Sequence, residues 1–190
     1  MTGHPPSPAP VRLRELRWTD FDDLREAYYL LYEERDSGYP IGIGLFGHRP
    51  SLADEAQWFQ GLFARVQNGA TIASVAEVGG HAVGSCMVNR VGPSEDSEAA
   101  HMGELGIMVH RDWRGRGVGS ALLEDALARS RGKFEIVRLA VFVNNPRARA
   151  LYERFGFVPY GRLPKALRRN GEFVDEDLLY LDFGTAPANR

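Results

Sequence analysis

Two kinds of hydrophobic periodicity alternate along the chain, one typical of strands and one typical of helices. Residues 11–17 (VRLRELR) alternate apolar and charged side chains, which predicts a half-buried strand. Apolar residues then recur at helical spacing over 21–31, and Thr19 and Asp22 have the spacing of a capping box that would begin this helix. The pattern therefore predicts a strand followed at once by a capped helix.

The segment 36–50 (DSGYPIGIGLFGHRP) breaks the helical pattern with glycine and proline but stays apolar. An apolar loop of this length indicates a packed or ligand-facing segment, and its part 42–46 could serve the interface of a homodimer. A second helix is predicted from a cap at Ser51 to about Asn68, with Trp58 among its inward-facing residues.

The rest of the chain is predicted to form mainly strands, with two further helices. A hairpin with a tight Gly79-Gly80 turn is predicted from strands at 71–78 and 82–91. Further strands are expected at 105–109, 135–143, 157–163 and 173–183, the last two separated by a polar arm. Helices are expected at 117–131 and 146–154, the latter with proline in its first turn.

This order of elements predicts one α/β domain (α+β by some schemes) over residues 11–183. Residues 1–10 are proline-rich and predict a flexible leader, and 184–190 form a C-terminal tail. The start has no apolar h-region, and no apolar run approaches the roughly 20 residues that span a bilayer. We therefore expect a cytoplasmic protein without a membrane partner.

Composition excludes several further classes of protein. The formal net charge of -2 argues against a nucleic-acid binder, which would carry a basic stripe. Cys86 is the single cysteine, so no intrachain disulfide can form. Histidine, cysteine and acidic residues do not recur at metal-ligand spacing, and we expect no metal site.

The stretch 111–123 (RDWRGRGVGSALL) places glycines directly before a predicted helix. Free N–H groups at a helix N-terminus bind anions, and glycine lets the backbone approach a phosphate closely. A nucleotide P-loop would need a lysine after Gly119, where Ser120 stands. The dinucleotide fingerprint GxGxxG begun at Gly115 would need glycine at the same Ser120. A phosphate or pyrophosphate of another ligand is therefore expected.

The spacing Arg114-x-x-Gly117-x-Gly119 resembles the Arg/Gln-x-x-Gly-x-Gly/Ala motif of the GNAT superfamily of N-acetyltransferases. The segment 145–157 (NPRARALYERFGF) is similar to that family's Asn-x-x-Ala-x-x-Leu-Tyr-x-x-x-Gly-Phe segment. The resemblance covers residues 11–183. It implies a mixed, mostly antiparallel sheet of six to seven strands, with helices on both faces and a splayed parallel pair in the middle.

The resemblance also implies acetyl-CoA as co-substrate, bound between the strands that end at Val109 and Val143. Arg114 would contribute its guanidinium to the pyrophosphate or shape the loop, and Arg116 would reach the 3′-phosphate side or remain a solvated surface residue. Asn145 would contact the cofactor arm, cap the following helix, or do both. The implied cofactor-binding residues are Ile107, Met108, Val109, Arg114, Gly115, Arg116, Gly117, Val118, Gly119, Ser120, Asn145, Ala148 and Tyr152.

N-acetylation requires that the amine lose a proton and that the departing thiolate gain one. Tyr152 matches the family's general acid by position; its other interpretation is aromatic packing. Glu104 matches the position of a carboxylate base, although one residue of strand register decides whether its side chain faces the site. His101 and His110 are rival bases because histidine titrates near neutrality.

The acceptor is expected to be a small amine, an amino acid or a peptide N-terminus. In this family its pocket is built by the first helices and their loop, here Tyr28, Tyr32 and 39–46, with the arm 165–173. One alternative is a non-catalytic acyl-CoA-binding or sensor domain on the same fold. Another is a nucleotide- or nucleic-acid-binding module, which the overall acidity weakens.

Overall fold

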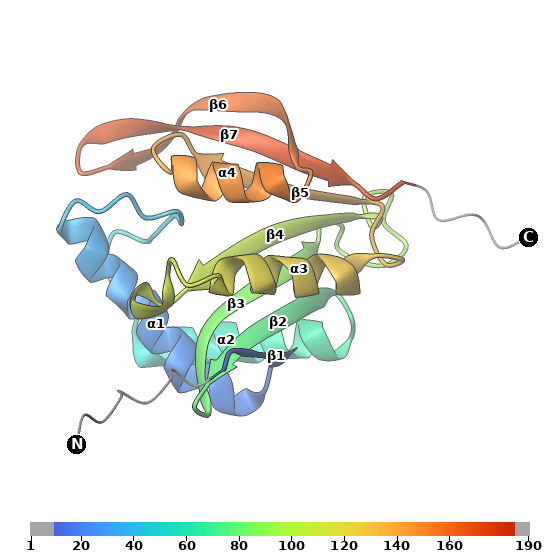
Figure 1. The fold of residues 1–190 in the computed structure, drawn as a ribbon, viewed down its shortest axis with the longest axis horizontal. Helices are drawn as coiled ribbons and strands as arrows, with labels where there is room; N and C mark the ends of the chain where they lie inside the picture. The colour runs from blue at the N-terminus through green and yellow to red at the C-terminus, as the bar shows by residue number, and fades with distance from the viewer. Residues whose placement is uncertain (1–9, 185–190) are drawn as a thin grey trace, which may run out of the picture.

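A seven-stranded sheet in the order β1-β2-β3-β4-β5-β7-β6 runs through residues 10–184, the part of the chain that this computed structural model describes (Figure 1). The strands are β1 (Arg12–Glu15), β2 (Thr71–Val78), β3 (His81–Arg90), β4 (Met102–Val109), β5 (Ile136–Phe142), β6 (Val158–Arg169) and β7 (Glu172–Asp182). The α-helices are α1 (Phe21–Asp36), α2 (Leu52–Gln67), α3 (Val118–Ser130) and α4 (Pro146–Arg154). The predicted leader and tail lie outside the described residues, apart from Pro10 and Gly184.

Helices cover both faces of the sheet, as the resemblance implied. Figure 1 views the sheet from the side of α3 and α4. On this side Leu122 and Leu123 of α3 pack on Val137 of β5 in the larger hydrophobic core. The smaller core lies on the opposite face, where Leu24 of α1 and Phe59 of α2 pack together. Alternate residues of each central strand therefore serve two separate layers.

The parallel pair β4–β5 separates along its length. β5 pairs with β4 only over Ile136–Arg138, opposite Met102–Glu104. Beyond that point β4 remains paired with β3 as far as Val109, while β5 remains paired with β7 as far as Phe142. The two halves of the sheet thus diverge, and the predicted splayed pair is confirmed.

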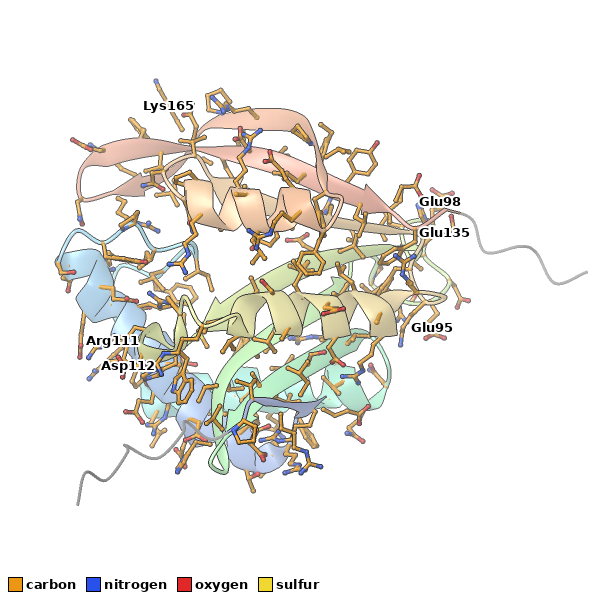
Figure 2. All side chains as sticks on the ribbon, in the orientation of Figure 1. Glu95, Glu98, Arg111, Asp112, Glu135 and Lys165 are labelled. Atoms are coloured by element: carbon orange, nitrogen blue, oxygen red, sulfur yellow. The ribbon has the colours of Figure 1, made fainter. Side chains whose placement is uncertain are left out.

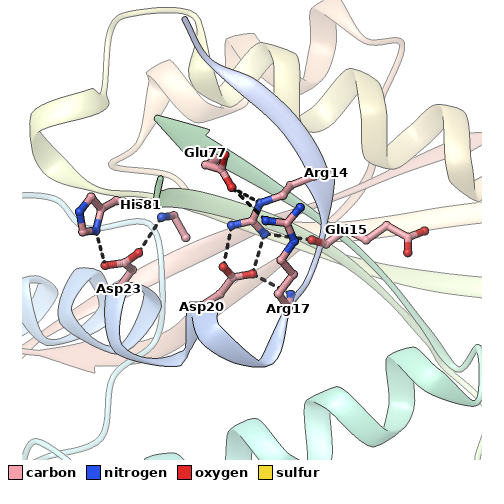
Figure 3. A network of polar contacts seen from close by, with 8 residues as sticks. Arg14, Glu15, Arg17, Asp20, Asp23, Glu77 and His81 are labelled. Atoms are coloured by element: carbon pink, nitrogen blue, oxygen red, sulfur yellow. Dashed lines mark hydrogen bonds and ion pairs between the residues drawn. The ribbon is translucent and has the colours of Figure 1, made fainter. Parts of the chain in front are cut away.

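The start of α1 differs from the prediction. The expected cap at Thr19 is wrong, because the residue that precedes the helix is Asp20, whose side chain makes no capping hydrogen bond to α1. The Asp20 carboxylate instead accepts the Arg17 amide at 2.7 Å. Arg14 of β1 donates two further hydrogen bonds to Asp20 and also pairs with Glu77 of β2 (Figure 3). A short 3-10 turn, Trp18–Asp20, precedes the helix instead of a capping box at Thr19. By contrast, the predicted cap of α2 is confirmed, since the Ser51 hydroxyl accepts the Asp54 amide.

The predicted polar arm near the C-terminus is also wrong. β6 continues to Arg169 and turns through Asn170 and Gly171, which adopt φ angles of 51° and 86°. Such an Asn-Gly turn joins strands of a hairpin, so the arm is an extension of β6 and β7. The inward placement of Trp58 is a further error, because 52% of this residue is exposed.

Candidate active site

The glycine loop between β4 and α3 presents unpaired backbone amides. Gly115 and Gly117 have φ angles of 77° and 83°, which residues with a Cβ adopt only under strain. Gly117 is the N-cap of α3 and supplies no side-chain cap, so the first-turn amides keep their hydrogen-bonding capacity. Val118, the first helical residue, is 2% exposed and anchors the helix in the core. The loop therefore has the geometry of the helix N-termini that bind anions in other proteins.

A cavity of about 440 Å³ extends from this loop into the gap between β4 and β5. Most of the predicted cofactor-binding residues line it: Ile107, Met108, Val109, Arg114, Gly115, Gly117, Gly119, Ser120, Asn145, Ala148 and Tyr152. Val118 is buried beneath the cavity, and Arg116 stacks its guanidinium on Trp113 at 5.0 Å on the surface. The cavity therefore combines unpaired strand edges with a phosphate-sized amide cluster, a donor set that fits a CoA thioester.

Arg114 is engaged by protein groups. Its guanidinium makes a bidentate ion pair with Glu34 of α1, at 2.6 and 2.9 Å, and its Nε donates to the Val109 carbonyl at 2.9 Å. Tyr39 lies against the same guanidinium. These contacts fix the glycine loop against α1 and agree with the loop-shaping role. The pairing of Arg114 with Glu34 was not predicted from the sequence, because no motif links the two residues.

Tyr152 lies at the bottom of the cavity with 7% of its surface exposed. Its ring packs edge-on against Phe157, at 5.8 Å between centroids. Its hydroxyl makes no hydrogen bond to any residue between 10 and 184. Burial raises the pKa of the Tyr152 phenol, so the group keeps its proton at neutral pH. The site thus contains a protonated phenol without a protein partner.

Asn145 joins two elements around the cavity. Its Oδ1 accepts the Ala148 amide at 3.2 Å and so caps α4. Its Nδ2 lies against the loop between α1 and α2, where a Cβ added at Gly42 would approach it to 2.6 Å. The capping role is therefore confirmed, and a side chain at position 42 would force the Asn145 amide to shift.

Glu104 faces the α1 and α2 side of the sheet, two positions before Gly106 and four before Met108 on the same face of β4. The side chain is 58% exposed and pairs with Arg138 of β5 at 2.8 Å. The rival histidines are held elsewhere: His101 contacts the Glu98 carbonyl at 3.0 Å, and His110 Nδ1 accepts the Asp112 amide at 3.3 Å. None of the three lines the cavity.

A second cavity of about 420 Å³, here called the acceptor chamber, lies between β3, β4 and the helices α1 and α2. It shares Ile43, Ile107 and Met108 with the first cavity, so the two meet at β4. Of the predicted acceptor residues, Tyr28, Ile43, Gly44 and Phe46 line this chamber. Contributions from α2 and β3 were missed by sequence reasoning: Asp54, Glu55, Trp58, Phe59, Ser85, Met87 and Asn89.

The hairpin β6–β7 does not line either cavity. Lys165 points outward along the edge of the sheet, away from the helices (Figure 2). Arg169 instead donates to the carbonyls of Ile41 and Ile43, at 2.8 and 2.9 Å, and holds the loop between α1 and α2 in place. The hairpin thus contributes to the site indirectly, by anchoring the loop that covers it.

Two further findings concern residues 10–184 as a whole. No cluster of three or more histidine, cysteine and acidic side chains has the arrangement of a metal site there. None of the helices in this range combines the length and the apolar composition of a bilayer-spanning segment.

Comparison with known proteins places the sequence among acetyltransferases. The sequence profile of the acetyltransferase (GNAT) family matches residues 4–157. An uncharacterized N-acetyltransferase of Methanocaldococcus jannaschii is 35% identical over 150 residues, which cover 76% of the chain and 59% of that protein. An L-amino acid N-acetyltransferase of Escherichia coli is 36% identical over 78 residues, or 40% of the chain and 48% of that protein. The chain thus spans about half to three fifths of the length of these relatives.

Solved structures agree at the level of the fold. A Salmonella typhimurium protein solved with its cofactor acetyl-CoA has a TM-score of 0.78 and 17% identity, with 96% of the chain and 99% of that protein covered. A ribosomal-protein-alanine N-acetyltransferase of Brucella melitensis has a TM-score of 0.75 and 23% identity, with 90% and 99% covered. On the profile match over most of its length, the chain belongs to the acetyltransferase (GNAT) family.

Proposed function

We propose that the protein is an acetyl-CoA-dependent N-acetyltransferase that acts on the primary amine of a small molecule or an amino acid. One observation carries the proposal: a cavity with a glycine-rich amide cluster and a protonated, unpartnered phenol meets a separate apolar chamber at Met108. A donor and an acceptor could therefore approach β4 from opposite sides. This arrangement supports direct transfer within a ternary complex.

On the donor side, the amides of the glycine loop would bind the pyrophosphate, and the free edge of β4 would pair with the pantetheine amides as an added strand does. Bound acetyl-CoA supplies the thioester that the amine attacks. The carbonyl oxygen would be stabilised by a backbone N–H of β4 near Met108. No metal is required for this chemistry.

Proton transfers are assigned to Tyr152 and Glu104. Tyr152 would donate its phenolic proton to the departing CoA thiolate, which is the role that its position in the cavity and its unpartnered hydroxyl support. Glu104 would accept the amine proton. Its exposure and its pairing with Arg138 favour a water-mediated transfer over direct contact with the amine.

The size and lining of the acceptor chamber favour a small substrate. Five aromatic side chains contribute to its wall: Phe21, Tyr28, Phe46, Trp58 and Phe59. A relative from Pseudomonas paraeruginosa, 26% identical over 69% of the chain, is an L-methionine sulfoximine/L-methionine sulfone acetyltransferase. Together with the L-amino acid N-acetyltransferase of E. coli, it supports an amino acid or a similar amine as acceptor.

The proposal is tested by donor binding and by turnover. We expect acetyl-CoA to raise the melting temperature, because it binds the native state only. We also expect release of CoA thiol when L-leucine, L-methionine, L-phenylalanine or 3-methylbutylamine is added. Absence of a melting shift at millimolar acetyl-CoA would refute the donor assignment, and a shift without turnover on any amine would favour a sensor domain.

A further inference from the structure

Glu55 is a buried carboxylate without a counter-ion. The residue is 8% exposed, and its carboxylate makes no hydrogen bond or ion pair within residues 10–184. The other buried acids are paired: Asp20 with Arg14, and Asp177 with Arg149 and Arg162. Glu55 is therefore the exception among the buried acids of the described chain.

An unpaired carboxylate in a poorly hydrated site has a free-energy cost that the fold must offset. Burial, reinforced by the nearby charge of Asp54, raises the pKa of Glu55, and Arg25 opposes this effect. Arg25 does not form an ion pair with Glu55: its Nη2 bonds Asp22 at 2.9 Å, and its Nε is buried without a partner. Glu55 thus retains capacity for a cation supplied from outside the chain.

The residues around Glu55 indicate which kind of cationic ligand would fit beside it. Glu55 lines the acceptor chamber, on the first turn of α2. Tyr28 lies close enough for the charge of Glu55 to act on its hydroxyl, and Phe21 and Trp58 contribute aromatic wall. Since Met108 lines both this chamber and the cavity at the glycine loop, an amine bound near Glu55 lies in a chamber that meets the site proposed for the thioester.

We propose that Glu55 binds the ammonium group of the acceptor and so selects small amines with an apolar body. This inference rests on the proposed function, because it assigns a specificity-determining residue to the same reaction. It also accounts for product release. The bound ammonium first gives one proton to water, on the path assigned to Glu104, and the free amine then attacks the thioester. Its second proton balances the one that the departing CoA thiolate gains, and the neutral amide so formed can no longer pair with the carboxylate.

The test compares Glu55→Gln with the wild-type enzyme, using 3-methylbutylamine and L-leucine as acceptors. We expect the acceptor KM to rise about 10- to 100-fold, the range of a charge-assisted hydrogen bond, while kcat changes less. The melting shift with acetyl-CoA should remain unchanged. Glu55→Asp should recover part of the loss, since it keeps the charge, and Glu26→Gln is the matched control because Glu26 is an exposed carboxylate of α1 outside both cavities.

A binding measurement keeps the inference testable without turnover. In the presence of CoA, calorimetry should find weaker 3-methylbutylamine binding to Glu55→Gln, but equal binding of the neutral N-(3-methylbutyl)acetamide to both proteins. Equal amine affinity, a parallel loss for the neutral amide, or no amine binding to the wild-type enzyme would each overturn the role of Glu55. Failure of acetyl-CoA to bind would instead overturn the proposed function.

Discussion

A buried tyrosine whose hydroxyl has no protein partner is poorly explained by packing alone, because phenylalanine would fill the same space without the cost of an unpaired polar group. Tyr152 is such a residue, and it lines the cavity at the glycine loop. If it protonates the thiolate, Tyr152→Phe should lower kcat about 100-fold, at the lower end of general-acid effects, and leave the acetyl-CoA Kd unchanged. Stopped-flow turnover and calorimetry measure the two quantities.

Tyr160→Phe provides the matched control for this change. Tyr160 is 53% exposed on β6 and lines neither cavity, so the loss of its hydroxyl should leave kcat at the wild-type value. Equal kcat values for Tyr152→Phe and the wild-type enzyme would remove Tyr152 as the acid. A lower kcat for both variants would point to a general effect of tyrosine loss.

For single residues, the sequence indicated which residues lie in the site better than it indicated what each of them contacts. The motif placed Asn145, Gly117 and Tyr152 together because all three lie on segments with a fixed local geometry. The partner of Arg114 was not predictable, since Glu34 is 80 positions away and only the fold brings it near. Glu55 was missed for the same reason: its first-turn position on α2 looks like an ordinary exposed acid until β3 and α1 close over it.

Ion pairs between elements fix the C-terminal hairpin to α4. Asp177 of β7 is 4% exposed and pairs with Arg149 of α4 and Arg162 of β6. The hydrogen bond from Arg162 holds the pKa of Asp177 below its usual range. Because the folded pKa is lower than the unfolded one, this stabilisation is present above the ordinary carboxyl pKa of about 3.9 and is lost as pH falls through the folded value.

We expect the free energy of unfolding of Asp177→Asn to depend less on pH in the acid range than that of the wild type. Urea denaturation at pH 7, 5, 4 and 3 should show wild-type stability falling more steeply below about pH 4 than that of the variant, which also starts lower at pH 7. Glu172→Gln is the control, since Glu172 lies exposed at the start of β7. Parallel curves for the wild type and Asp177→Asn would contradict the linkage.

Elements with strong periodicity were predicted nearly to the residue. The α2 cap, the β2–β3 hairpin and α4 follow from local side-chain chemistry alone. The extension of β6 was missed because an exposed edge strand has polar residues on both faces and a shifted register, here between Leu163 and Leu167. Thr19 was chosen as a cap because the four-residue capping pattern does not include the bonds that Asp20 makes to Arg14, six positions earlier on β1.

For the whole molecule, the decisive feature is that the sheet opens where two cavities meet. The separation of β4 from β5 after Glu104 was expected only through the family resemblance, since the amino-acid composition of the two strands does not predict it. The opening leaves the β5-facing edge of β4 without a strand partner over residues 105–109. Backbone amides on such an edge exchange with water readily unless a ligand pairs with them.

If acetyl-CoA pairs with β4 as an added strand would, hydrogen exchange of the β4 amides should become slower when it binds. Acetyl-CoA is expected to slow exchange of the β5-facing amides within 105–109 and of the first turn of α3, and removing it should restore the fast rates. The segment 74–76 of β2, which pairs with β1 on one side and with β3 on the other, should show no change in exchange rate. Protection at α3 without protection at β4 would mean that the ligand is held by its phosphates alone, and the strand-addition geometry would then be wrong.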